Sequence, residues 1–336
     1  MYSYGGKIEG GLSMKTSVKK SAQEIYPISL PTPFLVGPVN TYLIKGEALT
    51  LVDTGPFTKE TETKLEYELG VLGFSMKDIE LVILTHHHPD HIGLVHKFMP
   101  YAKIAGHPKL KPWLKKDKDF LERTMEFYTE MYFSHGVPEK WIKKMRQKNE
   151  QFMTFTEKAE LSTELTEGSQ IEGLSGWTVM ETPGHAQSHI SLFREKDGTM
   201  IAGDHVIEHI SSNAIIEAPY QHGEERPKTL LQYRDSLKRC LTSNYIYSGH
   251  GKTIENPKEL IQKRLDDQLG KAFSFKRKMG KGPIQVFDLC KEVYPQLYQK
   301  QTSLTFSETL GHLDLLEEKS EVGWEKVDGK ILYQVK

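Results

Sequence analysis

The sequence has few cysteines, no excess of charge and no long apolar segment. Cys240 and Cys290 are its only cysteines, and they lack metal-ligand spacing, so we expect two buried thiols in a reducing compartment. The net charge of −1 gives no global attraction to nucleic acid. No apolar run is long enough to cross a bilayer, and the N-terminus lacks the apolar core of a signal peptide. We therefore expect a cytoplasmic protein with no membrane partner.

Apolar runs and helical patterns alternate along the first part of the chain. Residues 40–55 predict a β-hairpin, 59–73 predict a helix, and the continuous apolar run 79–85 predicts a strand buried on both faces. Further strands are predicted over residues 101–107, 177–184, 189–195, 199–206 and 244–251. This alternation is typical of a layered α/β (α+β) domain.

Three regions are expected. Residues 1–27 would be a poorly ordered leader, 28–270 the main domain, and 271–336 a small C-terminal domain. Within the main domain, residues 108–160 are Lys-rich with many large apolar residues, which predicts an inserted helical pair. The insert is either a self-packed helical hairpin or a lid over a substrate pocket, because long insertions often carry function.

The C-terminal region has its own pattern. It predicts a helix over 284–294, a helix over 303–319 and a β-hairpin with its turn at Asp328-Gly329. Helix, helix, hairpin is the order of a winged-helix-like module. The preceding run 271–281 carries five basic residues and no acid, which suits contact with phosphates. Acidic residues later in the region offset this charge, so a packing or dimerisation module is the alternative.

The stretch THHHPDHIG, residues 85–93, crowds four histidines and an aspartate behind the strand 79–85. A turning loop can point His86 and His88 at one centre, and Asp90 and His91 at another. Imidazole and carboxylate groups suit zinc and neighbouring transition metals. The cluster therefore predicts metal ligands rather than a solvated histidine tract.

Three further ligand candidates follow later predicted strands. They are His185 after TPG, Asp204 after AG, and His250 in the setting Ser-Gly-His-Gly. Functional groups of α/β folds collect where strands run out into loops. The neighbouring glycines let the backbone approach such a centre closely.

Together these motifs resemble the metallo-β-lactamase superfamily. THHHPDHIG matches its H-x-H-x-D-H motif, and VDTG, TPGH, AGD and SGHG match its other motifs in the same order, over roughly residues 30–265. The resemblance implies an αββα sandwich with a metal site along one edge. It implies one metal ion on His86, His88 and His185, a second on Asp90, His91 and His250, and Asp204 bridging both. His87 matches no ligand position.

The sequence also suggests roles for residues near the candidate ligands. Asp53, in VDTG, would hold the free ring N–H of a ligand histidine, or would cap turn amides instead. A substrate pocket is expected from residues that follow Asp204, namely His205, His209, Asn213 and Tyr220.

The resulting functional prediction is a dinuclear metallohydrolase. A metal-bridging hydroxide would attack the substrate, and Asp90 would orient it and pass a proton to the leaving group. Zn²⁺ is the expected metal, with iron or manganese as alternatives. The glyoxalase II-like spelling of the motifs favours a small ester, thioester or lactone substrate. The alternative is a phosphodiesterase or endoribonuclease that holds nucleic acid with the C-terminal domain. The oligomeric state stays open, with a homodimer as one alternative.

Overall fold

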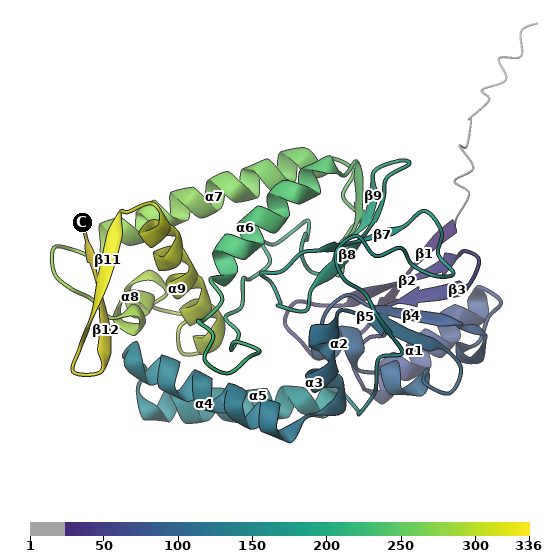
Figure 1. Cartoon of the computed structure of the whole chain (residues 1–336), viewed down its shortest axis with the longest axis horizontal. Coiled ribbons are helices and arrows are strands. Elements are labelled where there is room, and N and C mark those ends of the chain that lie inside the picture. Colours follow the sequence, from purple (N-terminus) through teal and green to yellow (C-terminus); the bar gives the residue numbers. More distant parts are fainter. Residues whose placement is uncertain (1–23) are drawn as a thin grey trace, which may run out of the picture.

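The structure is a computed structural model that describes residues 24–336. Two stacked β-sheets form one end of the molecule, and helices with a small hairpin form the other (Figure 1). Residues 1–23 of the predicted leader lie outside the described residues. Residues 24–27 belong instead to strand β1 (Glu24–Leu30), because this segment pairs antiparallel with β2 (Val39–Lys45).

The first sheet has six strands in sequential order from β1 to β6. β1 to β3 are antiparallel neighbours, whereas β3 to β6 run parallel. Its remaining strands are β3 (Leu49–Val52), β4 (Leu81–Leu84), β5 (Lys103–Gly106) and β6 (Thr163–Glu164). All four β4 residues are buried, as the continuous apolar run predicts.

The second sheet has four strands in the order β10-β9-β8-β7. Its strands are β7 (Thr178–Glu181), β8 (Ile190–Arg194), β9 (Thr199–Ile201) and β10 (Tyr245–Tyr247). β7 to β9 are antiparallel, and β10 joins β9 in parallel. A turn at Asp197-Gly198 joins β8 to β9, and Gly198 has the positive φ of 71° that favours glycine there.

Alternating side chains place helices on the outer face of each sheet. In β2, Leu43 packs with Leu65 and Leu69 of α1 (Lys59–Val71), while Tyr42 and Ile44 point to the second sheet. On the far side, residues of β9 and β10 pack against α6 (Thr229–Arg239) and α7 (Pro257–Lys278). The order is helix, sheet, sheet, helix, the four-layer sandwich that the resemblance implies.

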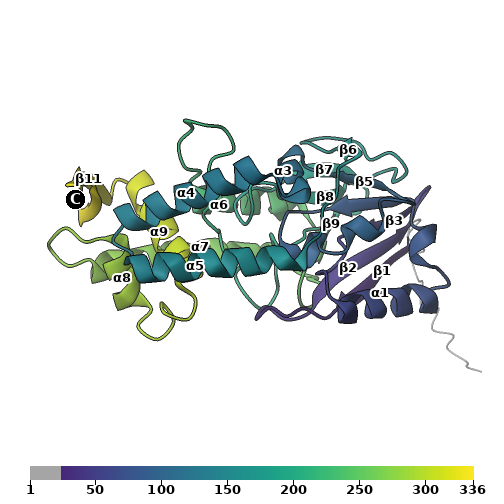
Figure 2. The ribbon, with the colours of Figure 1, turned by 90° about the horizontal axis from the view of Figure 1, so that it is seen from below.

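The helical end combines the insert with the C-terminal region. The insert contains α3 (Lys111–Lys115), α4 (Lys118–Ser134) and α5 (Glu139–Phe152), and the C-terminal region contains α8 (Val286–Val293) and α9 (Thr302–Glu318). Met131 and Met145 of the insert share one apolar cluster with Phe306 and Leu310 of α9. The insert is therefore packed on the C-terminal helices and is more than a self-packed hairpin (Figure 2).

The C-terminal elements follow the predicted order. After α8 and α9 comes the hairpin of β11 (Val322–Val327) and β12 (Lys330–Val335), with Asp328-Gly329 between its strands. The predicted domain boundary at 270/271 falls inside α7, because the apolar stripe of this helix continues to Ala272 and Phe275. No helix among residues 24–336 has the length and apolar character of a membrane span.

Candidate metal centre

The candidate ligands meet at the carboxyl ends of strands from both sheets. His86 lies in the loop that follows β4. This loop continues into the short helix α2 (Pro89–Ile92), which carries Asp90 and His91. The second sheet contributes His185 after β7, Asp204 after β9 and His250 after β10. Each strand fixes the position of a short loop, so a rigid scaffold holds side chains that are far apart in sequence.

Three histidines form a first group. The Nδ1 atom of His88 lies 3.0 Å from His86 Nε2 and 3.0 Å from His185 Nε2. His86 and His185 are buried, whereas His88 is half-buried, so the group opens to solvent on its His88 side. Their three nitrogens lie close enough together to ligate one ion.

A second group comprises Asp90, His91 and His250, with Asp204 beside both groups. His250 Nε2 lies 3.4 Å from Asp90 Oδ2 and 3.4 Å from Asp204 Oδ2. Asp204 Oδ1 lies 3.3 Å from His91 Nε2, and its Oδ2 lies 3.7 Å from His185 Nε2. Asp204 thus lies between the two groups, where a bridging carboxylate belongs.

Four histidines in these groups use their other ring nitrogen for a fixed hydrogen bond. His91 Nδ1 donates to Asp53 Oδ2 at 2.8 Å, and His250 Nδ1 donates to the Pro38 carbonyl at 2.8 Å. His185 Nδ1 reaches the Asn213 carbonyl at 2.9 Å, and His86 Nδ1 reaches Thr85 Oγ1 at 3.0 Å. These bonds set the ring tautomer and leave a lone pair aimed at the centre, as in protein metal sites.

Both carboxylate oxygens of Asp53 accept hydrogen bonds. Its Oδ1 accepts the Thr85 backbone N–H at 2.8 Å, and its Oδ2 accepts the Thr85 hydroxyl at 2.8 Å in addition to His91. Asp53 has the positive φ of 61° that its place after β3 requires. Asp53 therefore holds the ring of His91, as expected, and the backbone amide that it binds belongs to Thr85 beside β4 rather than to its own turn.

Buried atoms without partners mark the middle of the site. His91 Nε2, His250 Nε2 and Asp204 Oδ1 are buried and have no hydrogen-bond partner among residues 24–336. Buried polar atoms are normally paired. Three orphaned lone pairs on imidazole and carboxylate groups fit the ligands of Zn²⁺, iron or manganese.

The carboxylates give the site a negative potential. Burial lowers the pKa of His91, but Asp204 and Asp53 outweigh this effect and hold it well above its usual range. His250 behaves similarly: Asp204 offsets its burial and raises the pKa to about 10. The pKa of His86 is instead well below its usual range, because burial and neighbouring imidazoles disfavour its charged form. The carboxylates thus stabilise positive charge at His91 and His250, in the position that a divalent cation would take.

The four predicted pocket residues lie in different surroundings. His205 is fully buried, with its ring between those of His189 and Tyr233, so it cannot line an open pocket. The expectation for His205 is therefore wrong, because the chain turns inward directly after Asp204. His209 is exposed on the surface loop, against Gly251. Asn213 contacts His185 through its carbonyl, and Tyr220 lies half-buried against Trp113 of α3.

His87, Trp113 and Tyr220 form an aromatic wall that the sequence does not predict. The His87 ring stacks on Trp113 of α3 at a centroid distance of 4.2 Å and an interplanar angle of 8°. Trp113 Nε1 donates to Tyr220 Oη at 2.7 Å, and His87 Nδ1 pairs with Ser188 Oγ at 2.8 Å. His87 lies outside the metal groups, as predicted, but it joins the insert to the ligand loop.

Glu217 is a second residue that the sequence reasoning missed. Its side chain is buried, its Oε1 accepts the Gln187 backbone N–H at 2.7 Å, and its Oε2 has no hydrogen-bond partner among the residues described. Burial raises the pKa of Glu217 to about 8, so the carboxyl is mostly protonated at neutral pH. Nothing in the sequence around Glu217 distinguishes it from a solvated loop acid.

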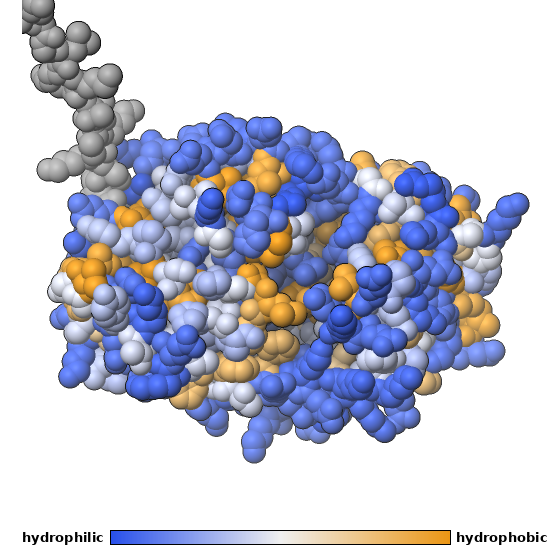
Figure 3. Space-filling model, turned by 180° about the vertical axis from the view of Figure 1, so that it is seen from behind, coloured by the Kyte–Doolittle hydropathy of each residue, from blue (hydrophilic) through white to orange (hydrophobic). Residues whose placement is uncertain are grey.

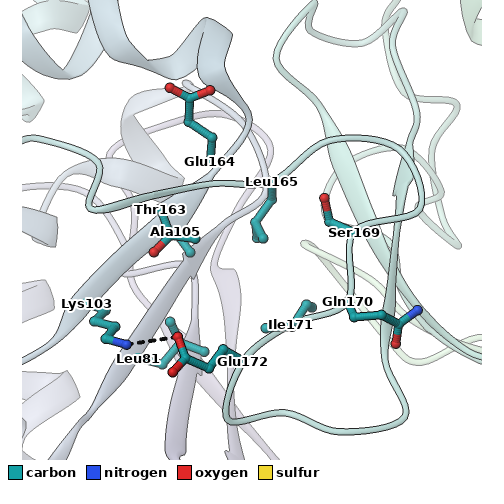
Figure 4. Close-up of a pocket in the computed structure, with 10 residues that line it drawn as sticks. All are labelled: Leu81, Lys103, Ala105, Thr163, Glu164, Leu165, Ser169, Gln170, Ile171 and Glu172. Atoms are coloured by element: carbon teal, nitrogen blue, oxygen red, sulfur yellow. Dashed lines mark hydrogen bonds and ion pairs between the residues drawn. The ribbon is translucent and has the colours of Figure 1, made fainter.

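Two concave regions lie outside this cluster. A cavity of about 240 Å³ opens at the amino ends of β4 and β5, where Lys103 and Glu172 form an ion pair at 2.9 Å (Figure 4). A larger groove of about 740 Å³ runs past Gly251, beside His250, and is lined by Asn40, Glu208 and Lys252 among others. Neither cavity contains any of the histidines of the candidate centre.

Sequence comparison places the chain in a family. The profile of the metallo-beta-lactamase superfamily matches residues 35–250. The chain belongs to the metallo-beta-lactamase superfamily. Among its relatives, Probable metallo-hydrolase YqjP of Bacillus subtilis (strain 168) is 39% identical over 305 residues, which cover 88% of this chain and 93% of the relative. With the histidine and aspartate cluster, this relationship identifies a metal-dependent hydrolase.

Two other comparisons extend this picture. A crystal structure of a metallo-beta-lactamase family protein from Thermus thermophilus has a TM-score of 0.76 at 26% identity, covering 93% of this chain and 98% of that protein. The similarity therefore includes the insert and the C-terminal region. Atrochrysone carboxyl ACP thioesterase of Aspergillus fumigatus is 24% identical over 234 residues, covering 68% of this chain and 55% of the relative.

Proposed function

We propose that this chain is a dinuclear metal-dependent hydrolase of a small ester, thioester or lactone. One observation carries the dinuclear part. Four histidines each hold one ring nitrogen in a hydrogen bond outside the centre and direct the other at a cluster of buried atoms without partners. Structural polar cores satisfy such atoms, whereas metal sites leave them for the ion.

Each part of the site would have a distinct role. His86, His88 and His185 would hold one ion, Asp90, His91 and His250 the other, and Asp204 would contact both. The two ions, when bound, supply a water of lowered pKa and positive charge for the developing oxyanion. Asp90 Oδ2 would hold the proton of the attacking water and pass it to the leaving group, because 10% of this side chain stays exposed and can contact a water.

The preference for a small carbonyl substrate rests on the surroundings of the first group. Stacked His87 and Trp113, together with Tyr220, supply an apolar, rigid wall with a few polar atoms, which is typical of small-ligand sites. The face seen from behind is hollowed between the sheets and the helical end, with apolar side chains on the rim (Figure 3). The relative named as an ACP thioesterase and the glyoxalase II-like motif spelling support the same substrate class.

The alternative of a phosphodiesterase or endoribonuclease depends on the C-terminal region. Its order of elements supports a winged-helix-like module. However, Lys271 of the basic run pairs with Glu308 at 2.5 Å, and Lys276 pairs with Glu321. These lysines already neutralise acids of the same region, so less positive charge is left to hold a phosphate backbone. A packing role for the C-terminal region is the better supported proposal.

A hydrolysis panel tests the substrate class. Purified protein of known metal content would be given a thioester, a lactone, an aryl ester, a bis-aryl phosphodiester and single-stranded RNA, each alongside His86→Ala. We expect metal-dependent turnover of at least one carbonyl substrate and intact RNA, because the wall suits a small apolar ligand.

The control is His222→Ala, which removes an exposed histidine of the surface loop and should retain the full rate. RNA or phosphodiester cleavage that falls steeply with salt, without carbonyl turnover, would contradict the proposed substrate class and support the nuclease alternative. Equal rates for wild type and His86→Ala on every substrate would contradict a role of the cluster in the reaction.

A further inference from the structure

The α4–α5 helix pair carries two separate rows of like charge. In each row, the charged residues recur every fourth position, so they lie on one side of their helix. All six side chains are exposed. The acidic row on α4 is Glu122, Glu126 and Glu130, and the basic row on α5 is Lys140, Lys144 and Lys148.

The acidic row points away from the body of the protein, and the basic row lies on the exposed flank of α5, where Lys148 also donates to the Lys300 carbonyl. The buried side of α4 carries Phe120, Thr124 and Met131, and the buried side of α5 carries Ile142 and Met145. The charged rows occupy the opposite sides of these helices. The two helices run along the same side of the molecule and diverge from their connection, with α6, α7 and α9 visible between them (Figure 2).

The rows are not neutralised within the described part of the chain. No ion pair within 4.0 Å joins an acid of the α4 row or a lysine of the α5 row to any residue of 24–336. Lys140 and Lys144 lie over the Trp141 ring, 5.7 and 4.4 Å from its centroid, and Lys148 Nζ donates to the Lys300 carbonyl. The acidic row faces solvent.

Such rows weaken isolated helices, because like charges four residues apart repel. Other helices of this chain place opposite charges at this spacing. Lys64 and Glu68 of α1 pair at 2.5 Å, and Lys263 and Asp267 of α7 pair at 2.5 Å. Glu139 with Lys143, and Arg146 with Glu150, pair in the same way on α5, so the unrelieved like charge is confined to the two rows, where a matching surface would relieve it.

The face matches a rotated copy of itself. α4 and α5 are antiparallel, joined by residues 135–138. A twofold axis parallel to the helices lays α4 of one copy across α5 of the other, again antiparallel. Glu122 then meets the Lys148 end of the partner helix, and Glu130 meets the Lys140 end. Every contact occurs twice, as an isologous interface requires.

We propose that the outer face of α4 and α5 is a homodimer interface in which the acidic row of each copy pairs with the basic row of the other. A face two helices wide and roughly 25 Å long buries roughly 1,000 Å² in total, near the lower limit for specific interfaces. The dimer is accordingly weak and sensitive to salt. A partner of a single charge sign fits less well, because one of the two rows repels it.

Charge reversal on single rows tests the interface. Lys140→Glu with Lys144→Glu makes the face wholly acidic, and Glu126→Lys with Glu130→Lys makes it more basic. Sedimentation velocity over a concentration series at low salt should show wild type dimerising, and each double variant dissociating at roughly tenfold or more higher concentration. An equimolar mixture of the two variants should restore a dimer, which is heteromeric.

A charge-matched control separates the interface from net charge. Lys196→Glu with Lys258→Glu changes the charge equally at exposed positions elsewhere and should dimerise like wild type. Hydrolysis rates of all variants should match wild type at low concentration, which shows that they are folded. A wild type that stays monomeric at low salt overturns the proposal, as does a dimer that neither double variant weakens.

Discussion

His88→Ala is expected to remove bound metal and hydrolytic activity together. His88 Nδ1 lies 3.0 Å from both His86 Nε2 and His185 Nε2, so it is the nitrogen that completes the first group. Changing a partner behind a ligand typically costs 10- to 100-fold in affinity or activity, and losing a ligand should cost at least about 100-fold. Metal content by mass spectrometry and turnover on the same sample measure both effects.

Two histidines outside the metal groups provide the controls for this substitution. His87→Ala removes a histidine from the same motif that lies outside the metal groups, so the protein should keep its metal content even if the wall is disturbed. His222→Ala, on an exposed loop, should keep both metal and activity. Full activity of His88→Ala without bound metal would contradict the assignment of this cluster.

Gly249→Ala is expected to damage the site without replacing a candidate ligand. A Cβ atom at Gly249 would lie 2.1 Å from Asp204 Oδ1 and 2.9 Å from the carbonyl carbon and oxygen of Gly203. Asp204 must then move from its position between the two groups. We expect loss of metal binding and a decrease of roughly 1–3 kcal/mol in the free energy of unfolding, the usual cost of overpacking.

Gly270→Ala is the matched control for this effect. Gly270 lies within α7, and no atom lies within 4 Å of a Cβ placed there. Alanine at this position should raise the free energy of unfolding by about 0.5–1 kcal/mol and leave metal content unchanged. Urea unfolding and metal analysis of both variants compare the two sites. Wild-type metal content and stability in Gly249→Ala would show that the close approach to Asp204 is unimportant.

The candidate ligands could be read from the sequence because each is local to a strand end. The apolar run 79–85 predicts a buried strand, and that strand places His86 at its carboxyl end, where functional loops gather. His185, Asp204 and His250 follow the same rule. Strand ends marked these positions as candidates, and the resemblance to the metallo-β-lactamase superfamily implied how they group.

The sequence could not predict the aromatic wall or the packing of the helices, because both depend on contacts between distant segments. Trp113 and Tyr220 are 107 residues apart and meet only because α3 and the loop after Asp204 pack together. His205 is next to the candidate ligand Asp204 in sequence, yet its side chain is fully buried. The boundary at 270/271 failed for a related reason. The basic run from residue 271 marks a change of composition, but the buried positions of α7 continue through it to Phe275.

Metal titration of the metal-free protein tests the central claim most directly. Zn²⁺ would be added in steps while bound metal and the rate on a responsive carbonyl substrate are measured on each sample. The account predicts that the rate rises from zero and levels off at about two ions per chain, matching the two ligand groups joined by Asp204. Full turnover by metal-free protein would contradict metal-dependent hydrolysis, and a plateau at about one ion per chain would contradict a dinuclear centre.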